Sequence, residues 1–220
     1  MRVYYAEAVY GEEEIEAVTE VLRDKSLTLM DGPSVKKFED RVSDAFGKKN
    51  GLMVNSGSSA NTLAIASLGL QAGDEVITPA LTFSTTVAPL IQQGLIPAFV
   101  DVEPDSYVID PEQIERMITP KTRALMIPNL IGNLADWSRL KEIADKHNLR
   151  TIEDSADTIG NLYKGQPTGE LSDISTTSFY ASHVMTGAGF GGMVCFNDDD
   201  IYSKAKQLRG WGRQSSLVGE

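Results

Sequence analysis

A short turn of small residues, "NSGSSAN" from Asn55 to Asn61, lies between the apolar stretch "GLMVN" and an apolar helical pattern. Such a turn, opening a helix after a strand, leaves backbone N–H groups free for an anion, usually a phosphate. Gly57 permits close approach of the anion, and the hydroxyls of Ser58 and Ser59 can add donors. The alternative is a helix cap in which the serines satisfy those N–H groups themselves.

Two further side chains follow apolar strand patterns, at the ends where α/β sheets bind ligands. Phe83 follows "EVITP", and its ring could stack on a planar ligand or could belong to the core. Asp154 ends "LRTIED", where a carboxylate can keep a pyridine nitrogen protonated and so make the pyridine ring an electron sink. A helix N-cap or a loop salt bridge would explain Asp154 equally well.

The stretch "SFYASHVMTGAGFGG" begins at Ser178 and contains His183, which lie 24 and 29 residues beyond Asp154. Ser178 adds a hydroxyl, and the imidazole of His183 can act as a general base near neutral pH. A lone histidine is more often a surface or core residue than a catalyst. Together, however, the four stretches supply a phosphate turn, a stacking ring, a carboxylate for a ring nitrogen and a base, which is far more specific than any one of them.

Helical and strand patterns alternate along the chain and must bring these stretches together. Acidic residues open the helical pattern "GEEEIEAVTEVLRD", and Pro33 and Gly47 bound the next one, "PSVKKFEDRVSDAFG". Strand–helix–strand alternation predicts an α/β fold of three layers around a mostly parallel, buried sheet. The predicted strands are "GLMVN", "EVITP", "IPAFVDV", "RALMIPNL", "LRTIED", "ISTTSFY" and "GGMVCF", and the later helices are "DPEQIERMI", "DWSRLKEIADKHN" and a segment from Asp198 to Leu208.

The composition argues against several classes of function. The 31 acidic and 20 basic residues give a formal charge of -11, which opposes nucleic-acid binding because that binding relies on basic side chains. No apolar stretch has the length of a signal peptide or a transmembrane helix, so we expect a cytoplasmic protein without membrane contact. Cys195 is the only cysteine, which leaves no internal disulfide and no cysteine cluster for a metal, and we expect Cys195 in the core.

The chain resembles the sugar aminotransferase and dehydratase family of pyridoxal phosphate (PLP) enzymes over essentially its whole length. The motifs that carry the resemblance are "GEEEIEAVTEVLRD", "NSGSSAN", "GDEVITPALTFSTT", "FVDVEPDSYVIDPEQIE", "IEDSADTIG" and "SFYASH". The resemblance implies that residues 1–220 form the cofactor-binding large domain of the aspartate aminotransferase fold (fold type I), with an N-terminal helical segment. It also implies a homodimer, and a small C-terminal domain that we expect to be absent here.

By position in these motifs, the resemblance implies a role for each candidate residue. Phe83 would stack on the cofactor ring, and Asp154 would pair with the ring nitrogen. Asp157 would approach the ring hydroxyl, and Asn133 in "LIGN" would form part of the pocket wall. The cofactor phosphate would be held by the turn and by a strand end, that is by Gly57, Ser58, Ser59 and Ser178.

Aminotransferases of this family have a lysine at the position of His183, and that lysine tethers the cofactor covalently. Imidazole cannot do so, although it remains a base. One branch of the family makes the same replacement, the 3-dehydratases of nucleotide-linked 4-keto-6-deoxyhexoses, and "NLIGN", "EDSAD" and "LRGWGR" also resemble that branch. The resemblance implies pyridoxamine phosphate (PMP) or PLP as cofactor and His183 as the base in loss of the sugar's C3 hydroxyl. Glutamate would regenerate PMP, in deoxysugar biosynthesis for lipopolysaccharide or glycosides.

The chain departs from this branch in several places. Some dehydratases hold an iron–sulfur cluster, but Ala156 and "WGRQSSLVGE" lack the cysteines, so we expect neither a cluster nor another metal. Val184 stands where these enzymes commonly have a second histidine. Arg209 and Arg213 could attract a nucleotide diphosphate or could lie on the surface. Two alternatives to a dehydratase stay open: a nucleotide-sugar aminotransferase-like enzyme, and a catalytically silent cofactor-binding or dimerisation module.

Overall fold

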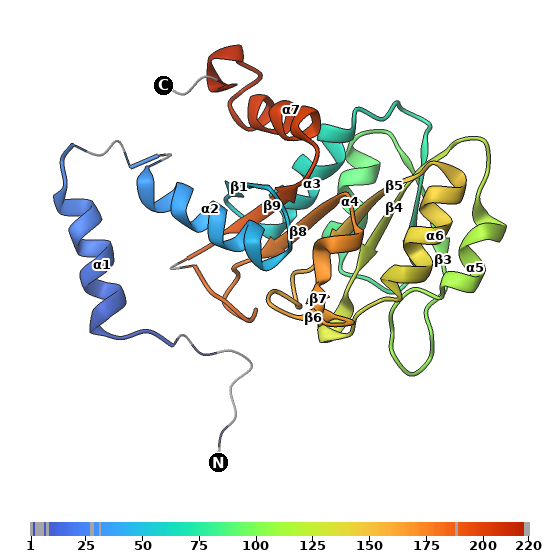
Figure 1. Cartoon of the computed structure of the whole chain (residues 1–220), viewed down its shortest axis with the longest axis horizontal. Helices are drawn as coiled ribbons and strands as arrows, with labels where there is room; N and C mark the ends of the chain where they lie inside the picture. Colours follow the sequence, from blue (N-terminus) through green and yellow to red (C-terminus); the bar gives the residue numbers. More distant parts are fainter. Residues whose placement is uncertain are drawn as a thin grey trace.

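A seven-stranded sheet with the order β1-β9-β8-β5-β4-β2-β3 forms the middle layer of the protein (Figure 1). The computed structural model describes residues 9–26, 29, 30, 32–187 and 189–217, together with Arg2 and Glu7. Neighbouring strands are parallel, except that β9 runs antiparallel to both β1 and β8. The strands are β1 Asn50–Val54, β2 Glu75–Pro79, β3 Ile96–Val100, β4 Thr122–Pro128, β5 Arg150–Asp154, β8 Ile174–Ser178 and β9 Gly192–Phe196, with a separate hairpin of β6 Leu162–Tyr163 and β7 Gln166–Pro167.

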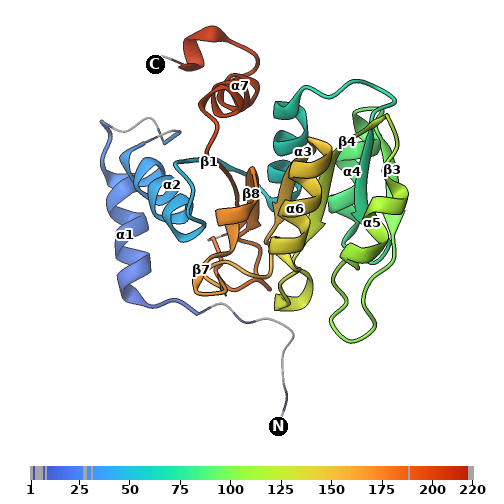
Figure 2. The ribbon, with the colours of Figure 1, turned by 45° about the vertical axis from the view of Figure 1, so that its right-hand side comes forward.

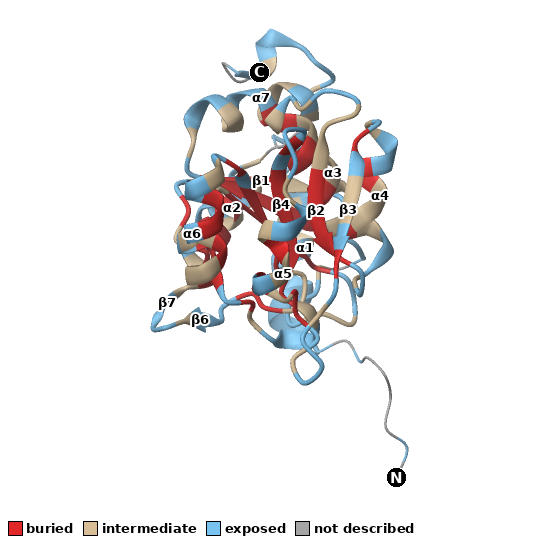
Figure 3. Cartoon of the chain, turned by 90° about the vertical axis from the view of Figure 1, so that its right-hand side faces the viewer, coloured by how far each residue is buried: buried red, intermediate tan, exposed pale blue. Residues whose placement is uncertain are grey.

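Helices cover both faces of the sheet and complete the three predicted layers (Figures 1 and 2). One buried cluster joins α3, α4 and α7 to one face, and two others join α2, α5 and α6 to the opposite face. Buried residues accordingly gather in the strands and on the helix sides that face them (Figure 3). The helices are α1 Glu12–Arg23, α2 Pro33–Ala45, α3 Gly57–Leu68, α4 Ser84–Gln92, α5 Pro111–Met117, α6 Trp137–His147 and α7 Asp199–Arg209, with short 3-10 turns at Leu130–Gly132, Thr168–Leu171 and Gln214–Leu217.

The predicted first helix forms as α1, but it lies at the edge of the fold (Figures 1 and 2). Its start is fixed locally, because the Glu14 carboxylate accepts a 2.6 Å hydrogen bond from the Gly11 N–H group. Its apolar residues, Ile15, Val18 and Leu22, are between 46% and 62% exposed, and α1 buries no residue. Among the described residues, no helix combines the length and the apolar character that crossing a bilayer would need.

Strand β5 carries two adjacent buried carboxyl groups on opposite faces, since side chains alternate along a strand. Asp154 faces α3 and α4, whereas Glu153 faces the other layer. Lys48 is only 3% exposed and donates a hydrogen bond to the Ser172 carbonyl oxygen. Burial lowers the pKa of Lys48 to about 8, although the nearby Glu153 charge opposes this shift. Glu153 accepts hydrogen bonds from four neutral side chains, those of Asn129, Ser155, Ser172 and Ser175.

The start of α3 lies directly against the ends of β8 and β9. A Cβ atom at Gly57 would lie 2.6 Å from the Ser178 Cβ. A Cβ atom at Gly192 would collide with the Ser56 carbonyl group and lie 2.6 Å from the Gly57 nitrogen. Glycine is therefore required at both positions by lack of space, which holds the turn before α3 against the sheet.

We expect the substitution Gly192→Ala to lower the free energy of unfolding by about 1–3 kcal/mol, because the added methyl group must displace the Ser56–Gly57 backbone. Denaturant unfolding followed by circular dichroism measures this change. Gly187→Ala is the matched control, since its Cβ would meet no atom closer than 3.5 Å. Equal unfolding midpoints for Gly192→Ala and the wild type would contradict the close-packing argument.

Candidate active site

A cavity of about 780 Å³ opens at the carboxyl ends of β1, β2, β4, β5 and β8. This is the edge at which open α/β sheets bind ligands, because the loops after parallel strands meet there. Residues from stretches far apart in the sequence therefore share one cavity. The predicted site residues that line it are Gly57, Ser58, Phe83, Asp154, Asp157, Ser178 and His183.

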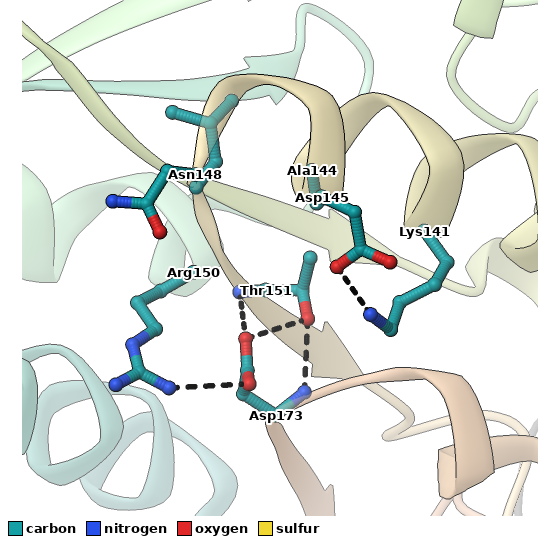
Figure 4. Close-up of a pocket in the computed structure, with 8 residues that line it drawn as sticks. Lys141, Ala144, Asp145, Asn148, Arg150, Thr151 and Asp173 are labelled. Carbon is teal, nitrogen blue, oxygen red and sulfur yellow. Dashed lines mark hydrogen bonds and ion pairs between the residues drawn. The ribbon is translucent and has the colours of Figure 1, made fainter.

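A second hollow, of about 350 Å³, lies at the opposite end of β5 (Figure 4). Its charged side chains pair with one another: Lys141 with Asp145, and Arg150 with Asp173 at 3.4 Å. Asp173 also accepts a 2.8 Å hydrogen bond from the Thr151 N–H group. Because these charges are matched within the protein, the larger cavity is the candidate active site.

The turn before α3 both caps the helix and lines the cavity. Ser56 is the N-cap, and its Oγ accepts a 3.1 Å hydrogen bond from the Ser59 N–H group. The Ser59 hydroxyl lies 3.1 Å from the Ser56 Oγ, so this predicted residue takes part in the cap and does not line the cavity. Gly57 and Ser58 do line the cavity, at the positive end of the helix dipole. The cap interpretation of "NSGSSAN" thus holds for Ser56 and Ser59, whereas anion binding by Gly57 and Ser58 stays a prediction.

The Asp154 carboxyl group is 8% exposed and faces the cavity. Its Oδ2 atom accepts hydrogen bonds of 2.8 Å from Asn61 Nδ2 and 2.9 Å from Thr86 Oγ1. Burial raises the pKa of Asp154, and these two donors partly offset that shift. Asp154 is thus neither a helix N-cap nor a surface ion pair but a buried carboxyl group held by neutral donors.

The cavity wall contains a large share of aromatic and aliphatic side chains. Phe83 is 68% exposed at the N-terminus of α4, so it belongs to the cavity wall and not to the core. Tyr180 and Phe190 stack with their ring centroids 5.8 Å apart, and both line the cavity. Such surfaces suit a planar ring, because aromatic groups stack face to face with an offset.

His183 lines the cavity beside Asp157, and its Nε2 atom lies 3.8 Å from Asp157 Oδ1. The other oxygen of Asp157 accepts a 3.1 Å hydrogen bond from the Ile131 N–H group. Ile131 has φ of 59°, a strained conformation for a β-branched residue, which directs this N–H group at Asp157. The His183 Nδ1 atom is buried and has no hydrogen-bond partner in the described part of the chain. Within the described ranges, no lysine lines the cavity.

Three of the predicted substrate residues lie outside this cavity. Asn133 is exposed and donates a 2.7 Å hydrogen bond to the Ser106 carbonyl oxygen. The Arg209 guanidinium donates to Glu39 at 3.0 Å and to the Met53 carbonyl oxygen at 3.1 Å, so it ties α7 to β1 and α2. Arg213 is exposed and lies over the Trp211 ring, 4.5 Å from its centroid. The expectation that Asn133 forms part of the cavity wall is not met in this structure.

Several residues that hold the carboxyl groups of the site were not singled out from the sequence. Asn61 and Thr86 hold Asp154, and Ile131 holds Asp157. Asn61 belongs to the turn motif "NSGSSAN" and lies four residues after Gly57, on the same face of α3. This four-residue spacing is the one sequence pattern that could have identified Asn61. Thr86 and Ile131 have no comparable sequence pattern.

The donors in the cavity fit a phosphorylated pyridine ring. A helix N-terminus with a serine hydroxyl suits the phosphate, a buried carboxyl group suits the ring nitrogen, and Phe83 suits the ring face. The absence of a Cβ at Gly57 lets the start of α3 pack directly on Ser178, so both residues border the same part of the cavity. Among the described residues, no group of three or more His, Cys, Asp and Glu side chains could hold a metal ion, and Cys195 is buried in β9.

Two known proteins with similar sequences are named for nucleotide-linked sugars. The chain is 39% identical over 214 residues to the dTDP-4-dehydro-2,6-dideoxy-D-glucose 3-dehydratase of Saccharopolyspora spinosa, covering 94% of this chain and 46% of the relative. It is 38% identical over 181 residues to the GDP-perosamine synthase of Caulobacter vibrioides, covering 82% of this chain and 48% of the relative. The chain thus spans about half the length of the curated relatives it matches.

Solved structures confirm the fold. The E. coli GDP-4-keto-6-deoxy-D-mannose-3-dehydratase with bound hydrated PLP superimposes with a TM-score of 0.84 and 33% identity, over 90% of this chain and 52% of that one. The predicted fold type I architecture is therefore confirmed. The model of the DegT/DnrJ/EryC1/StrS aminotransferase family matches residues 9–218. The chain belongs to this family of PLP-dependent sugar aminotransferases and dehydratases of nucleotide-sugar biosynthesis.

Proposed function

We propose that the protein is a PMP- or PLP-dependent 3-dehydratase of nucleotide-linked 4-keto-6-deoxyhexoses, acting in deoxysugar biosynthesis for lipopolysaccharide or glycosides. The observation that carries the proposal is the presence of His183, with no lysine among the described lining residues, in the cavity that also holds Asp154 and the Gly57 turn. Two dehydratases among the similar proteins support it. The proposal includes a cytoplasmic homodimer in which residues 1–220 form the cofactor-binding large domain, with glutamate as amino donor.

The residues that would hold the cofactor each have a defined task. The N–H groups at the start of α3 and the hydroxyls of Ser58 and Ser178 would bind its phosphate. Phe83 would cover one face of the ring, and Asp154 would accept the hydrogen of the ring nitrogen. When bound, the cofactor supplies a conjugated ring that takes up the electrons of a broken C–H bond.

His183 is the base in this proposal. Its imidazole borders the cavity and can take and return a proton there. The Asp157 carboxylate, 3.8 Å from Nε2, stabilises the positive charge that His183 carries while it holds the proton. The Ile131 N–H group keeps Asp157 in this place. Because imidazole cannot tether the cofactor as an amine does, the site retains proton transfer without covalent attachment.

A nucleotide-sugar aminotransferase is the second candidate, because GDP-perosamine synthase is among the similar proteins. A cofactor-binding module without turnover is the third. The three differ in the fate of the sugar, which makes them separable by product analysis.

Asp154→Asn should weaken PLP binding while stabilising the cofactor-free protein at neutral pH. The pKa of Asp154 is raised on folding, so the folded protein binds more protons, and stability is lost as the pH rises through the raised pKa. Asparagine avoids this loss, so the stability difference should be largest at neutral pH and should vanish below the ordinary aspartate pKa of 3.8. Urea unfolding at several pH values and fluorescence titration with PLP test both effects. The control is Asp157→Asn, at a more exposed carboxyl group, and a less stable Asp154→Asn variant at pH 7 would refute the expectation.

Borohydride treatment of the PLP-loaded protein should leave the wild type unlabelled and should label His183→Lys covalently. The reason is that an amine at position 183 would reach the cavity, whereas the described cavity lining contains no lysine. Intact-protein mass spectrometry detects the added cofactor mass. His147→Lys is the matched control, because His147 lies in α6 beside Glu115 and away from the cavity. Covalent labelling of the wild type would exclude the proposal.

Incubation of the purified protein with PMP, glutamate and a nucleotide-linked 4-keto-6-deoxyhexose should yield a sugar without its C3 hydroxyl, and His183→Asn should abolish this product. Mass spectrometry and NMR of the sugar identify the change. An aminosugar product would instead establish the second candidate, and tight cofactor binding without turnover would establish the third.

A further inference from the structure

Helix α3 crosses β8 in a register that places two pairs of residues in contact. Gly57 packs on Ser178, and four residues later Asn61 lies against Thr176, whose Oγ1 donates a 2.6 Å hydrogen bond to Asn61 Oδ1. Four residues make about one helical turn, and two residues along a strand return to the same face. The packing that forms the phosphate turn therefore also fixes where the Asn61 side chain lies.

The neighbours of Asn61 permit only one orientation of its amide group. The Nδ2 atom donates to Asp154 Oδ2 at 2.8 Å and to the Thr85 carbonyl oxygen at 3.2 Å. A carbonyl oxygen can only accept a hydrogen bond, and so can the Asp154 carboxylate in its ionised form. The Oδ1 atom accepts the hydrogen of the Thr176 hydroxyl. A flipped amide would direct Oδ1 at two acceptors, so the Thr85 carbonyl oxygen keeps the Nδ2 donor on the Asp154 side, and the Thr176 hydroxyl holds Oδ1 on the other side.

Asp154 is held on one of its two oxygens. Both strong donors, Asn61 and Thr86, bind Oδ2, whereas the Ala156 N–H group lies 3.4 Å from Oδ1. Asp154 is buried but lines the cavity, so Oδ1 is the oxygen left for a bound group. Burial raises the pKa of this carboxyl group, and the donors on Oδ2 favour its ionised form.

We propose that Asn61, oriented by Thr176, is a positioning residue that holds Asp154 ionised and aimed at the cofactor ring nitrogen. This inference rests on the proposed use of PLP or PMP. Asn61 would not touch the cofactor ring nitrogen, since it acts through Asp154 from one turn into α3. Thr176 would act one step further back, from the β8 strand.

The test compares PLP with its analogue in which carbon replaces the ring nitrogen. Asn61→Leu should raise the Kd of PLP about tenfold, the amount expected for loss of one hydrogen bond to a charged group, and should change the Kd of the carbon analogue less than twofold. Thr176→Val should shift the PLP Kd in the same direction by a smaller factor. Thr176→Ser, which retains the hydroxyl, should behave as the wild type. Fluorescence titration gives each Kd, and circular dichroism shows that each variant is folded.

If Asn61→Leu raised the Kd of PLP and the Kd of the carbon analogue by the same factor, Asn61 would only shape the cavity, and the inference would fail. It would fail likewise if Thr176→Val and Thr176→Ser behaved alike. If Asn61→Leu does not fold, comparison of Thr176→Val with Thr176→Ser still tests the inference. A wild type that binds neither ligand would overturn the proposed function and this inference with it, whereas ordinary PLP binding with unaffected variants overturns the inference alone.

Discussion

The close contact of α3 with the ends of β8 and β9 is the constraint on which the site depends. Gly57 and Gly192 leave no space for a side chain, so the helix can approach the sheet in only one register. That register presents the N-terminal N–H groups of α3 to the cavity and, one turn further, places Asn61 on Thr176. One packing constraint thus positions both the turn before α3 and the polar group that holds Asp154.

The two carboxyl groups at the end of β5 are buried in different ways. Burial of an ionised carboxylate is costly unless hydrogen bonds and charges compensate it. Glu153 has both oxygens bonded within the protein, close to the charge of Lys48, and belongs to the structural core. Asp154 has its two strong donors on one oxygen, Oδ2, and lines the cavity. Burial of a carboxyl group costs more than burial of an apolar residue, which agrees with the proposed contact of Asp154 with a cofactor ring nitrogen.

The strands could be predicted because short apolar runs bounded by glycine, proline and polar residues are typical of buried strands. The place of Asp154 in the cavity could also be predicted, because the carboxyl ends of parallel strands meet at one edge of the sheet. The direction of β9 could not be predicted, since the pattern "GGMVCF" suits a parallel or an antiparallel strand. In the structure, the described loop between β8 and β9 contains no helix of the kind that a parallel crossover uses, and β9 is antiparallel. The roles of Asn61 and Thr86 depend on the register of two helices against β5. The partner of Arg209, a glutamate 170 residues away, is equally invisible in a linear motif.

In the proposed function, His183 takes the place of a tethering amine, which changes what the remainder of the cavity must do. A covalent tether holds a cofactor regardless of modest errors in the other contacts, whereas an untethered cofactor is held only by the sum of its noncovalent contacts. In the proposed function, the phosphate turn and Asp154 therefore determine both affinity and the placement of the cofactor before His183. In that function, the close-packed turn and the two donors on the Asp154 carboxyl group would supply this placement. Under this proposal, rigid positioning takes over the role of the covalent tether.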